Sequence, residues 1–276
     1  MSLSRELQVH IIQLKEIRSI LNSMKNLAFM EIHKLQRFRT LQGQAVATIE
    51  QVALDFLDFY PGLAANDNNA VHVCILLGAE RGFCGDFNES LINTIATEFY
   101  TGVIAIGSRL CIRQEDIVHD LIATLEGANI AEEVPAIINC LFDTLSTFHD
   151  KAPLSLQLTV VYHDHNNQIS RRQVLPPSPQ QSESTTHYRI PPLLNMEPGE
   201  FFASLVDHYL VAVLHEIFYI SLTTENHSRL QHLEGAVNHL DDQTIKLQRK
   251  SQIYRQEEIT EEIEVILLNA EFTYTN

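Results

Sequence analysis

The sequence predicts an α/β protein in which a long antiparallel two-helix coiled coil, formed by the N- and C-terminal helices, flanks a central Rossmann-like α/β domain. Three observations predict this class. An apolar heptad pattern occupies residues 1–60, a strand–helix–strand pattern lies within residues 61–195, and a second long helical pattern occupies residues 196–276. Two long terminal helices on either side of one domain can pair only if they run antiparallel.

The N-terminal helix is predicted from apolar residues that recur in alternating steps of four and three. The positions are Leu3, Leu7, His10, Leu14, Ile17, Leu21, Met24, Ala28, Glu31, Leu35, Phe38, Gln42, Ala45, Ile49, Val52, Phe56 and Phe59. Such a sustained 3.5-residue repeat is typical of a coiled coil. The helix would be roughly 85 Å long and needs a partner of similar length. Pro61 and Gly62 end the pattern.

The central domain begins with a short apolar run at 71–77, which predicts a buried strand. A glycine-rich loop follows at 78–85. Asp86 is placed to cap a helix of about fifteen residues that ends near Thr101 and Gly102. A second buried strand is predicted at 103–106, so this stretch forms a βαβ unit with a parallel sheet.

The rest of the central domain has weaker signals. Residues 116–125 fit neither helix nor strand clearly, whereas residues 130–148 have the apolar spacing of an amphipathic helix. Residues 154–163 alternate as a strand, and residues 168–174 predict the second arm of a hairpin. The segment 176–192 is rich in proline, serine and glutamine, which predicts a mobile surface loop.

The C-terminal helix is predicted to open at residues 196–199, because Pro198 suits a helix entrance and no proline follows it. Its heptad stripe has two small polar interruptions, Thr244 and Ser251. The apolar members of the stripe are Leu230, Leu233, Val237, Leu240, Leu247 and Tyr254.

The formal net charge of −16 is spread unevenly. Residues 1–60 carry +1, residues 61–200 carry −10 and residues 201–276 carry −7. This balance argues against a nucleic-acid partner, because phosphate binding requires a basic surface. The four cysteines have no CxxC spacing, which indicates reduced thiols in a cytosolic compartment.

No membrane span or targeting segment is predicted. The most apolar stretch, 205–222, is interrupted by Asp207, His208, His215 and Glu216. The N-terminus alternates charged and apolar residues from the start, unlike a signal peptide. If the protein works at a membrane, another component must hold it there.

The loop at 78–85 lies between a strand and a helix, which is the setting of a nucleotide-binding loop. It lacks both the Gly-Lys-Ser/Thr sequence and GxGxxG, so we do not expect nucleotide binding here. We expect Gly82 and Gly85 to permit positive φ in a tight turn, and Cys84 to be a small packed thiol. No cluster of catalytic acid, base or nucleophile is evident, so neither catalysis nor a cofactor is expected.

Metal binding is also not expected. His163 and His165 are two residues apart, but two ligands alone do not make a zinc site. A polar pair at the end of a hairpin is the more ordinary interpretation.

Four stretches of the chain together resemble the gamma subunit of F-type ATP synthases. The first keeps Ile20, Met24, Lys25, Ala28, Lys34 and Gln36 of the family's N-terminal pattern. The second is the loop at 81–88, which resembles RGLCGGxN. The third has Glu225, Arg229, Leu233 and Ala236 in the spacing of SExxxRMxAM, and the fourth, 255–263, resembles RQxxITxEI.

The chain also departs from the family pattern. Glu31 and His33 stand where basic residues are usual, Asn269 replaces a glycine, and Val265 replaces a glutamate. We interpret the sequence as a diverged member of the family, from a housekeeping enzyme or from a second, specialised one.

The resemblance implies a non-catalytic rotor subunit. Its partners would be the hexamer of alpha and beta subunits, the epsilon subunit and the membrane c-ring, on the cytoplasmic side of a bacterial inner membrane. The ion could be H⁺ or Na⁺. The family register assigns hexamer contacts to Met24, Lys25, Arg255, Gln256, Ile259, Thr260 and Glu262, and places Met24 and Lys25 near the contact made by Arg255. It assigns a structural turn to Arg81, Gly82, Cys84, Gly85 and Asn88.

Two alternatives belong to other classes. The chain could be a small Rossmann-like enzyme whose helices make it a dimer, or a coiled-coil tether or chaperone without a motor role. The acidic run at 257–264 is most simply a solvated helix face, and its functional alternative is a surface matched to a basic collar on the hexamer.

Overall fold

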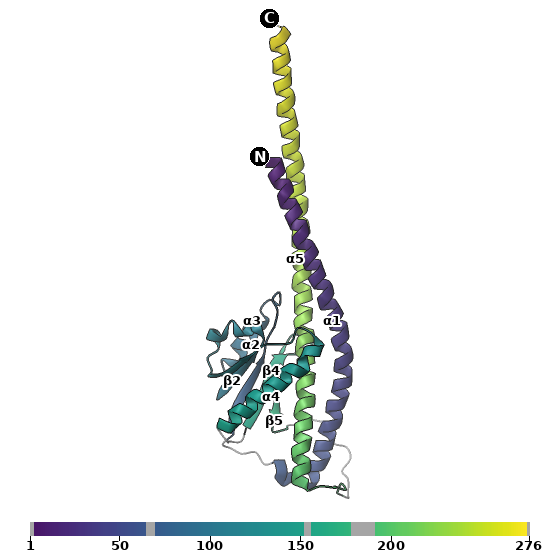
Figure 1. Cartoon of the computed structure of the whole chain (residues 1–276), viewed down its shortest axis with the longest axis vertical. Coiled ribbons are helices and arrows are strands. Elements are labelled where there is room, and N and C mark those ends of the chain that lie inside the picture. The colour runs from purple at the N-terminus through teal and green to yellow at the C-terminus, as the bar shows by residue number, and fades with distance from the viewer. Residues whose placement is uncertain (1–2, 65–69, 152–155, 178–190, 275–276) are drawn as a thin grey trace. The chain divides into compact units, whose positions relative to one another are not determined.

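The computed structural model describes residues 3–64, 70–151, 156–177 and 191–274 (Figure 1). Most of the loop predicted at 176–192 lies outside these residues. The chain divides into two compact units, one formed by residues 1–27 with 230–276 and the other by residues 28–229. Helix α1, Leu3–Phe59, and helix α5, Pro198–Tyr274, contribute to both. Their ends agree with the predicted stop before Pro61 and the predicted opening of the second helix at 196–199.

The smaller unit is an antiparallel pair of helices. Arg18 of α1 donates to Asp241 of α5 at 2.5 Å, and Lys25 lies 4.0 Å from Glu234. Because the partner number falls as the α1 number rises, the two helices run in opposite directions. Leu21 packs with Leu233 and Val237 in the apolar centre of this pair. The predicted antiparallel pairing is therefore confirmed.

The predicted heptad register of α1 is half right. One set of positions is buried as predicted, including Leu14, Leu21, Ala28, Leu35 and Phe56. The alternate set was placed one residue too early, since Ile17, Phe38 and Val52 are exposed. The buried members of the alternate set are instead Ile11, Ile32, Val46 and Ala53.

Charged residues explain this displacement. Arg18, Lys25 and Arg39 occupy the displaced positions, where each is only half-buried and reaches a polar partner from the edge of the seam. Long charged side chains can cover an apolar seam with their alkyl stems, so a charged residue can occupy a seam position. A heptad pattern drawn through apolar residues alone skips such a position and places the neighbouring apolar residue in the seam instead.

The heptad stripe of α5 is confirmed in the smaller unit. Leu233 and Val237 are buried, and Leu240, Leu247 and Tyr254 are half-buried. The two polar interruptions, Thr244 and Ser251, are also buried. Thr244 donates its hydroxyl to the Leu240 carbonyl, which satisfies it inside its own helix.

The larger unit contains one five-stranded sheet in the order β3-β2-β1-β4-β5. The first four strands are parallel and β5 is antiparallel to β4, which confirms the predicted parallel sheet and hairpin. The strands are β1 Val71–Leu77, β2 Gly102–Ile106, β3 Leu121–Leu125, β4 Leu156–His163 and β5 Ile169–Leu175.

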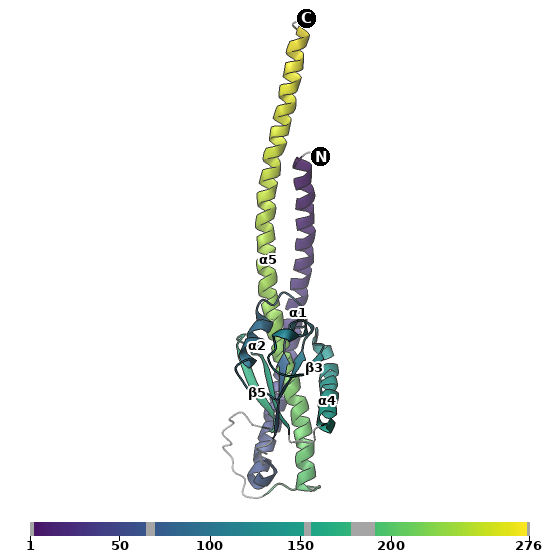
Figure 2. The same ribbon diagram turned by 90° about the vertical axis from the view of Figure 1, so that its left-hand side faces the viewer.

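Helices cover both faces of this sheet, as Figure 2 shows with α2 and α4 on opposite sides of the strands. Alternate residues of each strand enter different cores. Val73 and Ile75 of β1 pack with helix α4, Val134–Lys151, and with α1 and α5. Cys74 and Leu76 pack against helix α2, Phe87–Ile95, and helix α3, Ser108–Cys111. Strands buried on both faces explain the continuous apolar runs in the sequence.

Two local predictions need correction, and the structure resolves one ambiguous segment. Helix α2 has nine residues, not about fifteen, because the chain turns after Ile95 towards β2. Asp86 is at its N-cap position but makes no side-chain cap there. The ambiguous segment 116–125 contains the end of a short 3₁₀ helix, Gln114–Asp116, followed by strand β3.

Helix α5 contains an 18-residue window with mean hydropathy 1.4, long and apolar enough by composition to cross a membrane. Core helices of soluble proteins meet the same criterion, and Leu214 and Ile217 of α5 are completely buried in the sheet core. The absence of a membrane span therefore stays a prediction.

Candidate functional site

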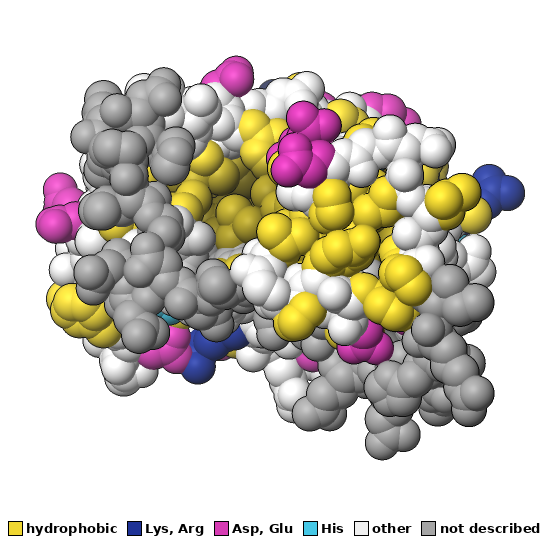
Figure 3. All heavy atoms as spheres, turned by 90° about the horizontal axis from the view of Figure 1, so that it is seen from below, with side chains coloured by type: hydrophobic (Ala, Val, Ile, Leu, Met, Phe, Trp, Pro, Cys, Tyr) yellow, Lys and Arg dark blue, Asp and Glu magenta, His cyan; other side chains and the backbone are white. Residues whose placement is uncertain are grey.

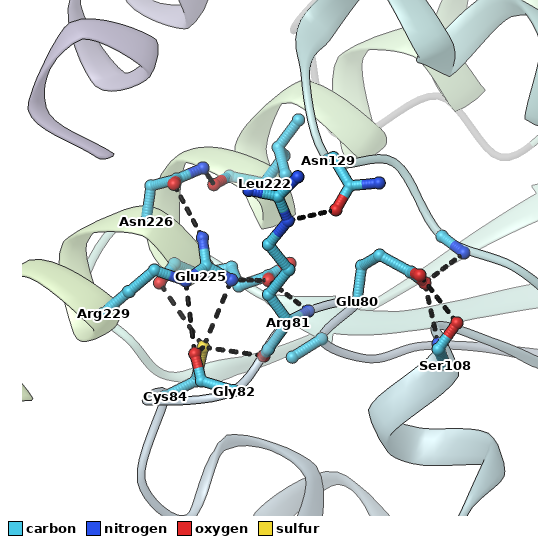
Figure 4. Close-up of polar contacts among 12 residues, drawn as sticks. Glu80, Arg81, Gly82, Cys84, Ser108, Asn129, Leu222, Glu225, Asn226 and Arg229 are labelled. Carbon is cyan, nitrogen blue, oxygen red and sulfur yellow. Dashed lines mark hydrogen bonds and ion pairs between the residues drawn. The ribbon is translucent and has the colours of Figure 1, made fainter. Parts of the chain in front are cut away.

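Two of the stretches that carry the family resemblance meet in the larger unit. The loop after β1 lies against α5, and Figure 4 shows the contacts. The backbone N–H of Arg81 donates to Glu225 at 3.3 Å, and Arg229 donates through Nε to the Gly82 carbonyl at 3.2 Å. Residues separated by almost 150 positions in sequence thus form one polar junction.

A buried ion pair lies at the centre of this junction. Glu225 and Arg229, one helical turn apart on α5, form a salt bridge and are 4% and 5% exposed. Arg229 also donates to Asn226 Oδ1 at 2.8 Å. Burial raises the pKa of Glu225, and the guanidinium of Arg229 opposes that rise. The pair is therefore isolated from solvent, and each charge depends on the other.

Cys84 is a packed thiol, as predicted. Its sulfur is buried, lies 3.6 Å from Arg229 Nη2 and donates weakly to the Gly82 carbonyl at 3.5 Å. Burial, and secondarily the charge of Glu225, raises the pKa of Cys84 from 9.0 to about 12. The thiol is therefore protonated at neutral pH and is a poor nucleophile.

This burial predicts selective alkylation by iodoacetamide. At pH 8 only about one Cys84 thiol in ten thousand would be ionised, whereas Cys140 is exposed. We expect mass spectrometry to find Cys140 labelled and Cys84 unlabelled in the folded chain, and both labelled in urea. Because folding raises the Cys84 pKa, its stabilising effect is complete below about pH 9 and is lost as pH rises towards 12. Equal labelling rates in the folded chain would contradict this packing.

The turn itself is partly as predicted. Gly85 has a positive φ of 65°, but Gly82 does not, and Phe83 takes the second positive-φ position with φ 65°. Asn88 closes the turn, because its Oδ1 accepts a hydrogen bond from the Ala79 N–H at 2.8 Å. The prediction for Gly82 is wrong because the turn places its left-handed residue one position later.

Glu80 is a site residue that the sequence analysis missed. Its carboxylate accepts bonds from the Ser108 N–H at 2.7 Å, the Ser108 hydroxyl at 2.6 Å and the Gly127 N–H at 2.6 Å. These donors follow β2 and β3 at the carboxyl edge of the sheet, where doubly wound proteins bind ligands. Glu80 takes up the N–H groups that a bound anion would use, which supports the prediction of no nucleotide site. An acidic residue inside a glycine-rich loop was the available signal.

The two histidines considered as ligands lie in different surroundings. His163 is buried, stacks on Phe87 at 3.9 Å and makes a 2.9 Å hydrogen bond with the Phe87 carbonyl. His165 lies 3.1 Å from Arg39. They do not form the predicted polar pair. No group of three or more potential metal ligands occurs within the described parts of the chain.

The predicted hexamer contacts lie in two places in the smaller unit. On α5, Arg255, Gln256, Ile259, Thr260 and Glu262 are all exposed. On α1, both Met24 and Lys25 are half-buried, and Met24 packs beside the Leu21 cluster.

The structure contradicts the expected closeness of these two places. Lys25 is opposite Glu234, so it lies about 30 Å along α5 from Arg255. The reason is the antiparallel pairing, in which the start of α1, rather than residues 24–25, lies nearest to Arg255.

Paired terminal helices, a sheet domain whose first loop is held to α5 by a buried ionic junction, and an α5 end with exposed apolar residues define a coiled-coil protein with one inserted α/β domain. A family model described as ATP synthase matches residues 4–271. The chain therefore belongs to the ATP synthase family, and its relatives within that family are gamma chains.

Relatives and solved structures agree with this assignment. The chain is 23% identical to the ATP synthase gamma chain of Clostridium perfringens, with 96% of each chain covered. It is 22% identical to that of Clostridium beijerinckii, with 95% of each covered. A chain of the Euglena gracilis mitochondrial ATP synthase OSCP/F1/c-ring structure has a similar fold, with a TM-score of 0.65 at 12% identity and coverage of 99% and 95%.

Proposed function

We propose that this chain is the rotor that couples ion translocation through a membrane c-ring to ATP synthesis or hydrolysis in a hexamer of alpha and beta subunits. The observation that carries the proposal is the end of α5. Within the residues described, α1 begins at Leu3 and its pairing with α5 reaches only about as far as Arg255. The α5 helix continues to Tyr274.

The surface of this α5 end fits a surrounding partner. Ile259, Ile263 and Ile266 recur at helical spacing and are 48%, 51% and 65% exposed. Exposed apolar residues at this spacing indicate a docking face. Acidic residues accompany them, namely Glu257, Glu258, Glu261, Glu262 and Glu264.

The face of the larger unit where α1 ends and α5 begins fits the membrane side of the assembly. Figure 3 shows hydrophobic side chains gathered around a hollow on the face where α1 ends and α5 begins. Exposed apolar residues near these helix ends include Leu63, Leu193 and Met196, at 38%, 96% and 50%. We assign this face to the c-ring and, from the family resemblance, expect the epsilon subunit beside it. The chain would then work at the cytoplasmic side of a bacterial inner membrane without catalysing a reaction itself.

Co-expression with the alpha and beta subunits from the same source tests the proposal. We expect a stable complex with ATPase activity that falls at least severalfold when Arg255 and Gln256 are both replaced by alanine, because both side chains are exposed where the α1 pairing ends. The matched control is Gln248→Ala with Arg249→Ala, which removes the same two residue types from exposed positions of the paired segment.

The outcomes separate the alternatives. Equal activity of the two double variants would remove the assigned contact. A chain that ignores the alpha and beta subunits but self-associates in sedimentation experiments would support a coiled-coil tether instead.

A further inference from the structure

A second buried ion cluster, independent of the Glu225 junction, joins the sheet to both long helices of the larger unit. Arg172 of β5 donates through Nη1 to Glu216 of α5 at 2.6 Å and through Nη2 to Glu50 of α1 at 2.8 Å. The side chains of Arg172, Glu50 and Glu216 are only 8%, 14% and 18% exposed. One guanidinium therefore bridges two helices that are far apart in sequence.

The chemistry of this cluster suits a rigid joint, meaning a connection that fixes the sheet to the two helices in one orientation. The planar guanidinium presents its donors in a fixed fork, so its two bonds define a direction as well as a distance. The apolar core around it, with Val46 and Val213 among its members, resists separation but is not directional. Burial alone lowers the pKa of Arg172, and pairing with Glu216 and Glu50 more than reverses this, so the charge is kept.

We propose that Arg172 is a positioning residue that fixes the sheet to α1 and α5 and thereby carries torque between the paired helices and the sheet domain. This inference rests on the proposed rotor function. A joint of this kind matters when the rotor works against a load. It should matter little when the hexamer hydrolyses ATP with no membrane sector attached.

The test compares loaded and unloaded enzyme. Arg172→Lys keeps the charge but replaces the planar fork with a point charge on a flexible stem, so it no longer fixes the direction of the two bonds. In the complex with alpha and beta subunits alone, we expect ATP hydrolysis to stay within twofold of the parent. In the complete enzyme in sealed vesicles, we expect ATP-driven ion pumping, followed with a membrane-potential dye, to fall at least threefold.

Two controls isolate the joint. Arg113→Lys changes an arginine that also pairs with two carboxylates, Glu89 and Asp116, but lies exposed within the sheet domain. Tyr209→Phe removes a buried hydroxyl beside the guanidinium and leaves both ion pairs of Arg172 in place. Both variants should pump like the parent.

The outcomes are decisive in each direction. If Arg172→Lys does not assemble, Glu50→Ala removes only the contact with α1 and takes its place with the same expected loss of pumping. Pumping at the parental level by the assembled variant would overturn the inference, as would an equal loss of hydrolysis and pumping. A parent chain that forms no complex would instead overturn the proposed function.

Discussion

Arg229→Met is expected to lower the free energy of unfolding by about 3–5 kcal/mol, because it leaves the Glu225 carboxylate buried without its counter-charge. Glu225 would keep the bond from the Arg81 N–H but lose the guanidinium that balances its charge. Urea unfolding of the isolated chain, followed by far-UV circular dichroism, measures this loss.

The loss should depend on pH in a defined direction. Burial raises the pKa of Glu225, so the folded state holds its proton more tightly than the unfolded state does. The contribution of Glu225 to the free energy of unfolding is therefore complete below the ordinary pKa of a carboxyl group. It is lost as the pH rises through the pKa that Glu225 has in the folded state. Without Arg229 the pKa of Glu225 in the folded state rises further. The destabilisation caused by Arg229→Met should therefore be larger at pH 8 than at pH 5.

Two comparisons identify the cause. Glu225→Gln combined with Arg229→Met removes both charges and should recover most of the loss. Arg18→Met breaks an exposed pair with Asp241 and should change stability much less. A loss for Arg229→Met that is independent of pH, or unrecovered in the double variant, would show that lost packing rather than charge is responsible.

Much of the fold could be predicted because the signals are local and repeated. The apolar run 71–77 forms strand β1, and α5 begins at Pro198, within the predicted opening of the helix. The heptads fixed the existence of both long helices. They did not fix the α1 register, because Arg18 and Lys25 are tolerated at the seam edge only through Asp241 and Glu234, which are more than 200 positions away. Partners at that separation are set by the tertiary fold.

The site was predictable only in part for the same reason. The loop 81–88 and the Glu225–Arg229 spacing were each recognised, but their contact depends on α5 packing beside the sheet. Glu80 and Arg172 bear charges that a sequence analysis assigns to the surface by default. Both are held by groups from other elements, so their roles become visible only when the strands and helices are placed.

Gly107→Ala is the second change for which we expect a large effect, a loss of about 3 kcal/mol or more in the free energy of unfolding. Gly107 has φ 119°, a conformation that residues with a side chain rarely adopt. An added Cβ would lie 2.8 Å from the Gly78 carbonyl oxygen and 2.9 Å from that of Ala79. The loop after β1 has little room to move away, because Gly78 is itself packed against Leu110.

Gly235→Ala is the matched control, since it adds the same methyl group to an exposed helical position with no neighbouring atom within 4 Å. There alanine removes the conformational cost of glycine in a helix and should raise stability by about 0.5–1 kcal/mol. Urea unfolding of both variants should therefore give changes of opposite sign. A loss below about 1 kcal/mol for Gly107→Ala would mean that the carboxyl edge of the sheet, where Glu80 binds Ser108 and Gly127, adapts more easily than its close packing implies.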